Sequence, residues 1–324
     1  MTPHFIAEIS SNHNRDLSRC LQFIDTAADM GCDGVKFQLF KIDELFAPEI
    51  LAKSETHRQR SKWELPLKFL PDLAAQCRDK GLFFSCTPFY MAAVEELYPY
   101  VDFYKIASYE LLWDDLLTAC AQTGKPVVLS TGMATLQEIE HAVTVILKAL
   151  PRELETGARR SGIPPVTLLH CVSGYPVPAD QCNLAVIQTL KNYLSREYKL
   201  QAFGYSESHA INVGWSDHSV SWEIINRAVN KWNVSMIEFH LDLDGKGEEF
   251  ASGHCWLPGQ MGKVITQIRK HKSEEAGRTK VSGDVMDGTK AKQPAPVELA
   301  DRDWRADPSD GLRPLKPIRK TWNG

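Results

Sequence analysis

Two lysines of this sequence stand in short apolar runs, where an ammonium group needs an anionic partner. Lys36 lies in GVKFQ and Lys105 lies in FYKIA, and burying either charge alone would carry a large desolvation cost. Four hydroxyl-bearing residues end or follow similar runs: Thr87, Ser108, Ser130 and Ser216. Two fixed positive charges among hydroxyl groups would form a cage for a phosphate and a carboxylate on one ligand.

Two other interpretations of these lysines stay open. In the structural one, each ammonium group pairs with a carboxylate from another strand, such as Glu8 or Glu238. In the catalytic one, Lys36 or Lys105 forms a Schiff base, as in metal-free aldolases.

Two histidines end successive strand-like runs, His218 in GWSDHS and His240 in IEFHL. Both can point inward, with Asp217, Glu8 or Glu238 nearby to complete or orient a divalent-metal site. Two imidazoles with oxygen ligands suit manganese, iron, cobalt or zinc better than calcium. A similar piece, GYSESH, makes His209 the alternative to His218, which we prefer because its spacing to His240 suits one strand–helix unit.

The elements that must position these side chains alternate along the chain. Eight short runs rich in β-branched and aromatic residues predict strands at 5–10, 34–40, 82–88, 102–108, 126–132, 166–172, 213–219 and 235–241. Apolar residues at helical spacing predict helices at 17–28, 71–79, 113–122, 136–150, 185–196, 221–232 and 259–271. Eight such units in about 270 residues predict a closed (β/α)8 TIM barrel, and no GxGxxG or P-loop favours an open nucleotide-binding sheet.

Two helix ends have recognisable capping residues. Asp16 can cap the first helix, and Gly31 can end it in the left-handed conformation. Thr135 and Glu138 have the spacing of a capping box. In a barrel, catalytic groups lie where the strands end, which adds Glu110, Ser173 and Tyr175 to the candidates.

Composition excludes several classes of function. The chain has 324 residues, with 37 Lys or Arg against 41 Asp or Glu and a formal net charge of -4, so it lacks the basic excess of a nucleic-acid or membrane-surface binder. The eight cysteines are scattered without a CxxC pair, which is typical of reduced thiols. No apolar run is long enough for a membrane span, and we expect a cytoplasmic protein.

The expected domain organisation is a barrel over residues 1–271 followed by an arm over residues 272–324. The arm is polar and rich in Gly and Pro, so we expect no independent core there. Four large apolar residues can anchor it to the barrel or to a partner subunit: Trp304, Leu312, Leu315 and Trp322. The polar stretch from Lys41 to Lys62 predicts either a functional loop, such as a lid, or a plain flexible insertion.

Eight ordered motifs resemble the sialic acid synthase family, whose members condense phosphoenolpyruvate with an N-acylated amino sugar to give a nonulosonic acid. They are IAEISSNHN, GVKFQLF, CTPF, YKIASYE, KPVVLSTGMATLQEIEHAV, LLHCVSGYPVP, SDH and IEFHLDLD. The similarity runs from about residue 4 to residue 245. It implies a metal-dependent aldol-type condensation with the sugar, N-acetylmannosamine or a related aldose, in its open-chain form.

Matched position by position, the resemblance implies a role for each candidate. His218 and His240 correspond to the ligands of a manganese-type ion, with Mg2+ or Co2+ as alternatives. The residues matched to phosphoenolpyruvate binding are Lys36, Thr87, Lys105, Ser108, Ser130 and Ser216. Catalytic carboxylates are expected at Glu8, Glu110, Asp217 and Glu238, and sugar contacts at Ser173, Tyr175 and His254. Glu110 or Glu238 is the candidate for handling the proton of the water, and the enzyme is expected to be a homodimer.

Two departures from the family pattern lie after the eighth strand-like run, and two others are Arg15 and Ser173. After the eighth strand-like run, GKGEEFASGHCWLP replaces a Gly-Pro-Asp-His run, so Glu248 or Glu249 stands in for the aspartate or that contact is absent. The C-terminal residues do not resemble the antifreeze-like domain that supplies an arginine to the sugar, and we expect the arm around Trp304, Arg305 and Arg313 to do a related job. These departures keep open a non-catalytic barrel that binds phosphoenolpyruvate or a sugar.

Overall fold

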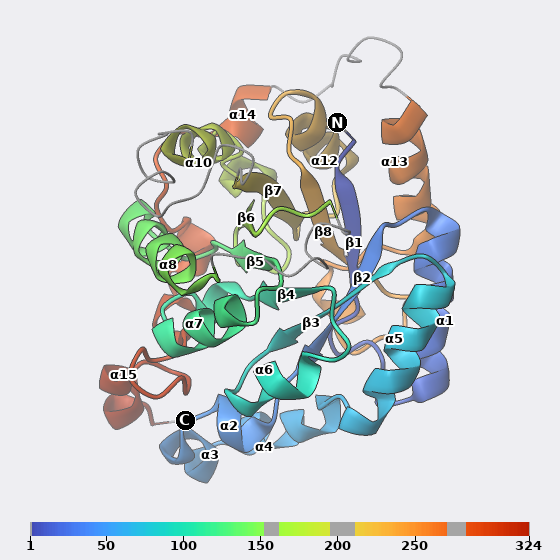
Figure 1. Ribbon diagram of the computed structural model, residues 1–324. Coiled ribbons are helices and arrows are strands. Elements are labelled where there is room, and N and C mark those ends of the chain that lie inside the picture. Colours follow the sequence, from blue (N-terminus) through green and yellow to red (C-terminus); the bar gives the residue numbers. More distant parts are fainter. Residues whose placement is uncertain (1, 152–161, 195–210, 271–282, 324) are drawn as a thin grey trace.

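The chain folds into a closed barrel of parallel strands surrounded by helices (Figure 1). The computed structural model describes residues 2–151, 162–194, 211–270 and 283–323. Each strand pairs with the next in chain order, and β1 pairs with β8 to close the barrel. The strands are β1 (His4–Glu8), β2 (Gly34–Leu39), β3 (Phe83–Pro88), β4 (Phe103–Ile106), β5 (Val127–Ser130), β6 (Val166–His170), β7 (Asn212–Asp217) and β8 (Met236–His240). The predicted (β/α)8 barrel is confirmed.

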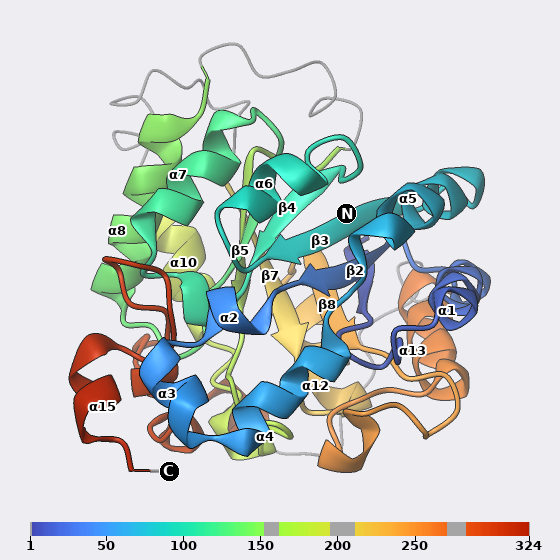
Figure 2. The ribbon, with the colours of Figure 1, turned by 90° about the horizontal axis from the view of Figure 1, so that it is seen from below.

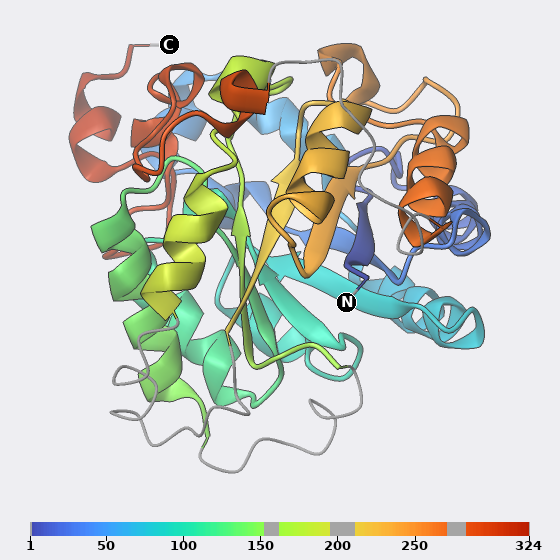
Figure 3. The ribbon, with the colours of Figure 1, turned by 90° about the horizontal axis from the view of Figure 1, so that it is seen from above.

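Helices that follow the strands form the outer layer, which Figure 3 shows from the opposite side to Figure 2. They are α1 (Leu17–Met30), α5 (Leu70–Asp79), α6 (Ala92–Leu97), α7 (Asp114–Gln122), α8 (Leu136–Ala149), α10 (Val186–Leu194), α12 (Trp222–Asn230) and α13 (Pro258–Lys270). The short helix α6 was not predicted, because six residues are too few to establish a helical period. Within the described ranges, no helix is both long and apolar enough to cross a membrane.

The barrel interior changes from apolar to polar along each strand. One small apolar cluster contains Ile163 and five inward strand residues: Ile6, Phe103, Val128, Leu169 and Met236. Side chains two residues apart on a strand share a face, so the next inward positions are Glu8, Lys105, Ser130, Cys171 and Glu238. The intervening residues pack outward in the main core beneath the helices. The strands therefore place an apolar plug below and a polar layer at their carboxyl ends.

Predicted caps fix the ends of two helices. The Asp16 side chain accepts a hydrogen bond from the backbone N–H of Arg19 at 3.2 Å, and Gly31 ends α1 with a φ of 82°. At α8, Thr135 and Glu138 form the reciprocal capping box. These local signals set where the two helices begin or end, and both predictions are confirmed.

The insertion after β2 forms a run of short helices over one side of the barrel mouth. It contains α2 (Ile42–Leu45), α3 (Pro48–Lys53), α4 (Glu55–Arg58), η1 (Gln59–Trp63) and η2 (Leu67–Phe69). Ile42, Leu45 and Phe46 pack with Phe40 and Phe89 in a separate apolar cluster. The stretch from Lys41 to Lys62 is thus a packed cover with a small core of its own.

The C-terminal arm runs across the carboxyl ends of the strands to the insertion, drawn in red in Figures 1 to 3. Its elements are α14 (Gly283–Asp287), η8 (Pro296–Glu298), η9 (Arg302–Trp304) and α15 (Lys316–Thr321), and α15 contacts α3. The backbone of Arg313 bonds to that of Leu45 and Ala47, each at 2.9 Å. Trp304 stacks on His57 with ring centroids 5.1 Å apart. The expected boundary at 271/272 lies outside the described residues.

Candidate active site

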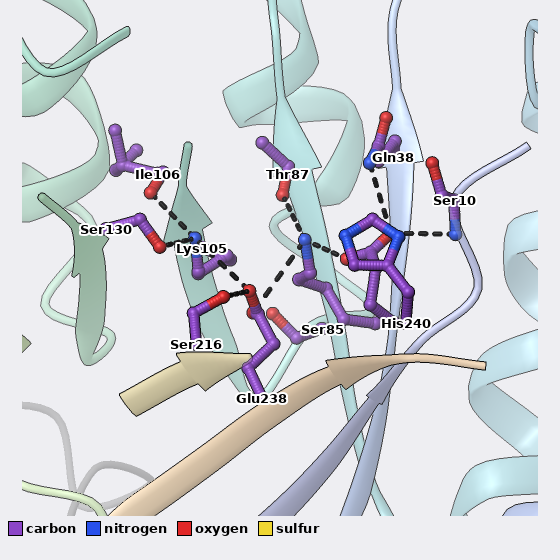
Figure 4. Close-up of polar contacts among 12 residues, drawn as sticks. Ser10, Gln38, Ser85, Thr87, Lys105, Ile106, Ser130, Ser216, Glu238 and His240 are labelled. Carbon is purple, nitrogen blue, oxygen red and sulfur yellow. Dashed lines mark hydrogen bonds and ion pairs between the residues drawn. The ribbon is translucent and has the colours of Figure 1, made fainter. Parts of the chain in front are cut away.

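Two lysines and two carboxylates occupy the polar layer inside the barrel (Figure 4). The Nζ atoms of Lys36 and Lys105 each lie 3.8 Å from a different oxygen of Glu238. Lys36 also forms an ion pair with Glu8. Glu8 in turn accepts hydrogen bonds from the Ser10 backbone at 2.7 Å and from Gln38 at 3.1 Å. Each predicted lysine therefore has a carboxylate neighbour, and the cluster holds the charges at the strand ends.

Hydroxyl groups surround these charges. Thr87 accepts from Lys36 at 3.3 Å and Ser130 accepts from Lys105 at 2.6 Å, while Ser216 donates to Glu238 at 3.0 Å. Ser108 accepts from the Gly132 backbone at 3.0 Å and lies 3.2 Å from the sulfur of Cys171. All six residues of the predicted anion cage are at most 6% exposed. Five of the six are linked to one another through Glu238, whereas Ser108 contacts Gly132 and Cys171 instead.

Burial and neighbouring charges shift the pKa values of this cluster in opposite directions. Burial alone would raise the pKa of Glu238, but the ammonium groups of Lys105 and Lys36 lower it to about 2. Burial lowers the pKa of Lys36 to about 8, against the opposing effect of Glu238. Glu238 is therefore a fixed negative charge at neutral pH, whereas Lys36 is close to losing its proton.

Three histidines gather beside the cage. The ring centroids of His218 and His240 are 5.3 Å apart, and those of His240 and His254 are 4.6 Å apart. Glu249 lies between the last two, 3.0 Å from His240 Nδ1 and 3.6 Å from His254 Nε2. Donor atoms of His240, Glu249, His254 and Cys255 all lie within 4.8 Å of one another. The histidine cluster consists of His218, His240, Glu249, His254 and Cys255.

This donor set fits a divalent transition metal. The Nδ1 atom of His218 is 2.8 Å from the carbonyl oxygen of Val172, a contact that makes Nδ1 the protonated nitrogen and leaves the Nε2 lone pair for a ligand. Burial alone would raise the pKa of Glu249, but hydrogen bonds from His240 and His254 hold it well below its usual range. Imidazole and carboxylate groups together suit manganese, iron, cobalt or zinc. The structure thus favours Glu249 over Glu248 beside the histidines, because Glu248 faces Lys62.

The two predicted sugar contacts other than His254 lie beside these clusters. The Tyr175 ring is 4.3 Å from His218 and 4.9 Å from His254 between centroids, and its side chain is half-exposed. Ser173 is buried, and its Oγ has no hydrogen-bond partner within the described part of the chain. His254 belongs to the histidine cluster itself, so its position suits metal binding as well as a contact with the sugar.

Asp217 is not brought into the site. Ser216 faces Glu238 inside the barrel, so the next side chain on β7 points to the opposite face. Its carboxylate accepts hydrogen bonds from Trp215 at 3.1 Å, Trp256 at 2.9 Å and Ser219 at 2.6 Å. These contacts tie β7 to the segment after β8, and Asp217 thereby acts on the position of its neighbour His218.

Glu110 meets an arginine from the C-terminal arm. Arg313 Nε donates to Glu110 Oε1 at 2.8 Å, and the second bond from its Nη2 reaches the same oxygen. Burial raises the pKa of Glu110, with Arg313 opposing the shift. Among the three arm residues singled out from the sequence, Arg313 is the one that reaches a predicted catalytic group, whereas Arg305 binds Glu138 at 3.1 Å.

Another arm residue, Glu298, holds the ends of β5 and β6, and sequence reasoning missed it. Its Oε1 atom accepts from the backbone N–H groups of Met133 and Ser173, both at 2.7 Å, and Oε2 accepts from Ala295 at 2.8 Å. Both strand-end donors and Glu298 itself are buried. The arm is therefore part of the wall of the site.

Replacing Glu298 by alanine is expected to lower the free energy of unfolding by about 2 to 4 kcal/mol, because two buried N–H groups lose their acceptor. Urea unfolding would measure the change. The matched variant Glu95→Ala, at an exposed position, should stay within about 0.5 kcal/mol of the parent. Equal midpoints for both variants would contradict the role assigned to Glu298.

Comparison with known proteins places these residues in a family. The NeuB family model matches residues 23–280. The chain belongs to the NeuB family. The N,N'-diacetyllegionaminic acid synthase of Campylobacter jejuni is 34% identical over 276 residues, covering 82% of this chain and 75% of the relative. The N-acetylneuraminate-9-phosphate synthase of Drosophila melanogaster is 28% identical, covering 81% of this chain and 66% of the relative.

Solved structures of similar proteins superpose on this fold. The spore coat polysaccharide biosynthesis protein SpsE of Bacillus subtilis superposes with a TM-score of 0.71 at 26% identity, covering 93% of this chain and 77% of that one. The sialic acid synthetase of Leptospira borgpetersenii, solved with citrate, gives 0.68 at 29% identity, covering 88% and 89%. The predicted resemblance to the sialic acid synthase family is confirmed, and so is the prediction of a synthase-type transferase.

Proposed function

We propose that this NeuB-family enzyme condenses phosphoenolpyruvate with an N-acylated amino sugar and water to give a nonulosonic acid and phosphate. The observation that carries the proposal is the pair of buried ammonium groups, ringed by hydroxyls at the strand ends, beside a cluster of three histidines and Glu249. A phosphate and a carboxylate on one small ligand are the groups that such a cage would hold. The named synthases among its relatives support the same reaction class.

Lys36 and Lys105 bind the two anionic groups of phosphoenolpyruvate in this proposal. Ser130 and Thr87 already contact the ammonium groups, and Ser108 and Ser216 complete the ring. Glu238 balances the two positive charges and fixes their positions. The new carbon–carbon bond joins C3 of phosphoenolpyruvate to the aldehyde carbon, water adds at C2, and the bond between C2 and the phosphate oxygen breaks.

His218 and His240 would hold a divalent ion, Mn2+ in our proposal with Mg2+ or Co2+ as alternatives. When bound, such an ion supplies Lewis acidity toward the aldehyde oxygen. Glu249 orients His240 through the 3.0 Å contact to its Nδ1, which is how a supporting carboxylate fixes the tautomer of a ligand. Asp217 keeps the segment around His218 in place.

Of the two candidates for handling the proton of the water, we propose Glu110. The pKa of Glu238 is held at about 2, which makes it a weak base. Burial raises the pKa of Glu110, and its buried Oε2 has no hydrogen-bond partner in the described residues. A group with a raised pKa and a free oxygen suits general acid–base work near neutral pH. Glu8 holds Lys36 in place through their ion pair, while Ser173, Tyr175 and Arg313 contact the sugar.

Phosphate release from phosphoenolpyruvate with Mn2+ and a panel of aldoses headed by N-acetylmannosamine tests the proposal. We expect sugar-dependent release that stops when the metal is removed with a chelator. Trapping of pyruvate by borohydride would instead identify a Schiff-base aldolase using Lys36 or Lys105. Phosphoenolpyruvate binding without turnover on any sugar would favour a non-catalytic barrel.

We further propose that the enzyme is cytoplasmic and, as the resemblance implies, a homodimer. Because Arg313 reaches Glu110 within one chain, the partner subunit is not needed to supply this arginine. Light scattering on the purified protein measures the assembly.

A further inference from the structure

A pocket of about 150 Å3 lies between the barrel mouth, the insertion and the arm. Ser10, Ser11 and Glu249 line one part of it, and Arg60, Trp63 and Arg313 line another, with Gln38 and four apolar residues completing the wall. Glu249 contacts His240, so the pocket adjoins the histidine cluster. The pocket therefore connects the reacting centre to two arginines.

The arginine part of the pocket has more hydrogen-bond donors than acceptors. Arg60 Nε and Trp63 Nε1 are buried and have no hydrogen-bond partner within the described ranges. Arg313 is paired with Glu110, whereas Arg60 forms no ion pair with any carboxylate that the structure describes. Asp301 and Tyr109 are the acidic groups that act on Arg60, and burial together with Arg313 outweighs them and lowers its pKa.

Aromatic groups fix the orientation of the Arg60 guanidinium. Its Cζ lies 5.6 Å from the Phe46 ring centroid and 5.9 Å from that of Trp63. Cation–π contacts of this kind hold the charge but do not satisfy the N–H groups at the edge of the guanidinium. The buried Nε–H of Arg60 and Nε1–H of Trp63, both without an acceptor in the described residues, match the oxygens of a phosphate or a carboxylate.

We propose that Arg60, with Trp63, recognises an anionic group on the end of the acceptor sugar remote from its aldehyde. The inference rests on the proposed function, because the aldehyde must lie at the histidine cluster for condensation. The chain of the open sugar then extends along the pocket toward Arg60. A neutral end would leave Arg60 without an ion pair at contact distance, whereas a phosphate or carboxylate would accept from its Nε–H and pair with its charge.

The test compares three acceptors with the full-length enzyme: N-acetylmannosamine, its 6-phosphate, and the corresponding uronic acid. We expect kcat/KM to favour an anionic acceptor by about tenfold or more, the size of a charge-assisted contact. Whichever anionic acceptor is preferred identifies the group as phosphate or carboxylate. In Arg60→Gln this preference should disappear, with the KM values for phosphoenolpyruvate and the neutral sugar unchanged.

Two further variants separate recognition from folding. Arg58→Gln changes an exposed arginine of α4 that pairs with Glu55, and it should keep the preference for the anionic acceptor. Trp63→Phe removes one N–H donor and keeps the aromatic ring, so it should weaken the preference without removing it. Circular dichroism melting curves check that each variant is folded.

Calorimetric binding of the same three sugars distinguishes failure of this inference from failure of the proposed function. Arg60-dependent binding of an anionic sugar without turnover would support the inference and contradict the synthase. Turnover of N-acetylmannosamine with no preference for an anionic acceptor would overturn the inference and leave the synthase intact. Equal losses on all three sugars in Arg60→Gln would also overturn it, because that result indicates a structural role.

Discussion

Replacing His218 or His240 by alanine is expected to lower the affinity for Mn2+ by more than about 100-fold and to abolish sugar-dependent phosphate release. Loss of a carboxylate that merely supports a metal ligand costs about 10- to 100-fold, and removing an imidazole ligand should cost more. Both rings are buried, and their centroids are 5.3 Å apart. A water molecule in place of either imidazole would therefore not restore the Mn2+ affinity. Calorimetric titration with Mn2+ measures the affinity independently of activity.

Further variants identify which side chains contribute to Mn2+ affinity. His141→Ala removes an exposed histidine that pairs with Asp114 and should leave Mn2+ affinity unchanged. Glu249→Gln should weaken it by about 10- to 100-fold through His240. Cys255→Ser should have little effect on Mn2+, because burial raises the pKa of this thiol to about 12 and manganese prefers oxygen and nitrogen ligands. Unchanged Mn2+ affinity in both histidine variants would place the metal elsewhere.

The barrel and most of the anion cage could be predicted because they depend on local sequence period. Side chains two residues apart on a strand share a face. Lys105 and Ser130 therefore face inward, as Phe103 and Val128 do. The same period excludes Asp217 from the interior when Ser216 faces inward. The resemblance placed Asp217 near the metal, whereas its bonds to Trp215 and Trp256 depend on a contact with the segment after β8.

Contacts between distant segments could not be read from the sequence. Glu298 lies 165 residues from Met133 and 125 from Ser173, and its apolar sequence neighbours Val297 and Leu299 do not indicate the backbone groups that it accepts from. Arg60 stands in a charged stretch typical of an exposed loop, and only the packing of the insertion against the arm encloses it. Chain topology, more than residue type, decides which polar residues of such segments reach the site.

Lys36→Met is expected to raise the KM for phosphoenolpyruvate by about 100-fold or more, since it removes a buried charge from the anion cage. The parent enzyme should also lose kcat/KM for phosphoenolpyruvate as the pH rises through about 8. Burial lowers the pKa of Lys36 to about 8, so the ammonium group is present below that pH and is lost above it. A profile of kcat/KM against pH from 6 to 10 measures this decline. The pKa obtained from it is that of a group in the free enzyme.

Lys36→Arg decides whether Lys36 acts as a charge or as a nucleophile. Arginine stays protonated throughout this range, so an electrostatic role predicts measurable activity whose decline above pH 8 is removed. A Schiff base needs a primary amine, and a catalytic imine at this position would leave Lys36→Arg inactive at every pH. The depressed pKa of Lys36 is compatible with both mechanisms, and the arginine variant separates them because it keeps the charge while removing the nucleophile.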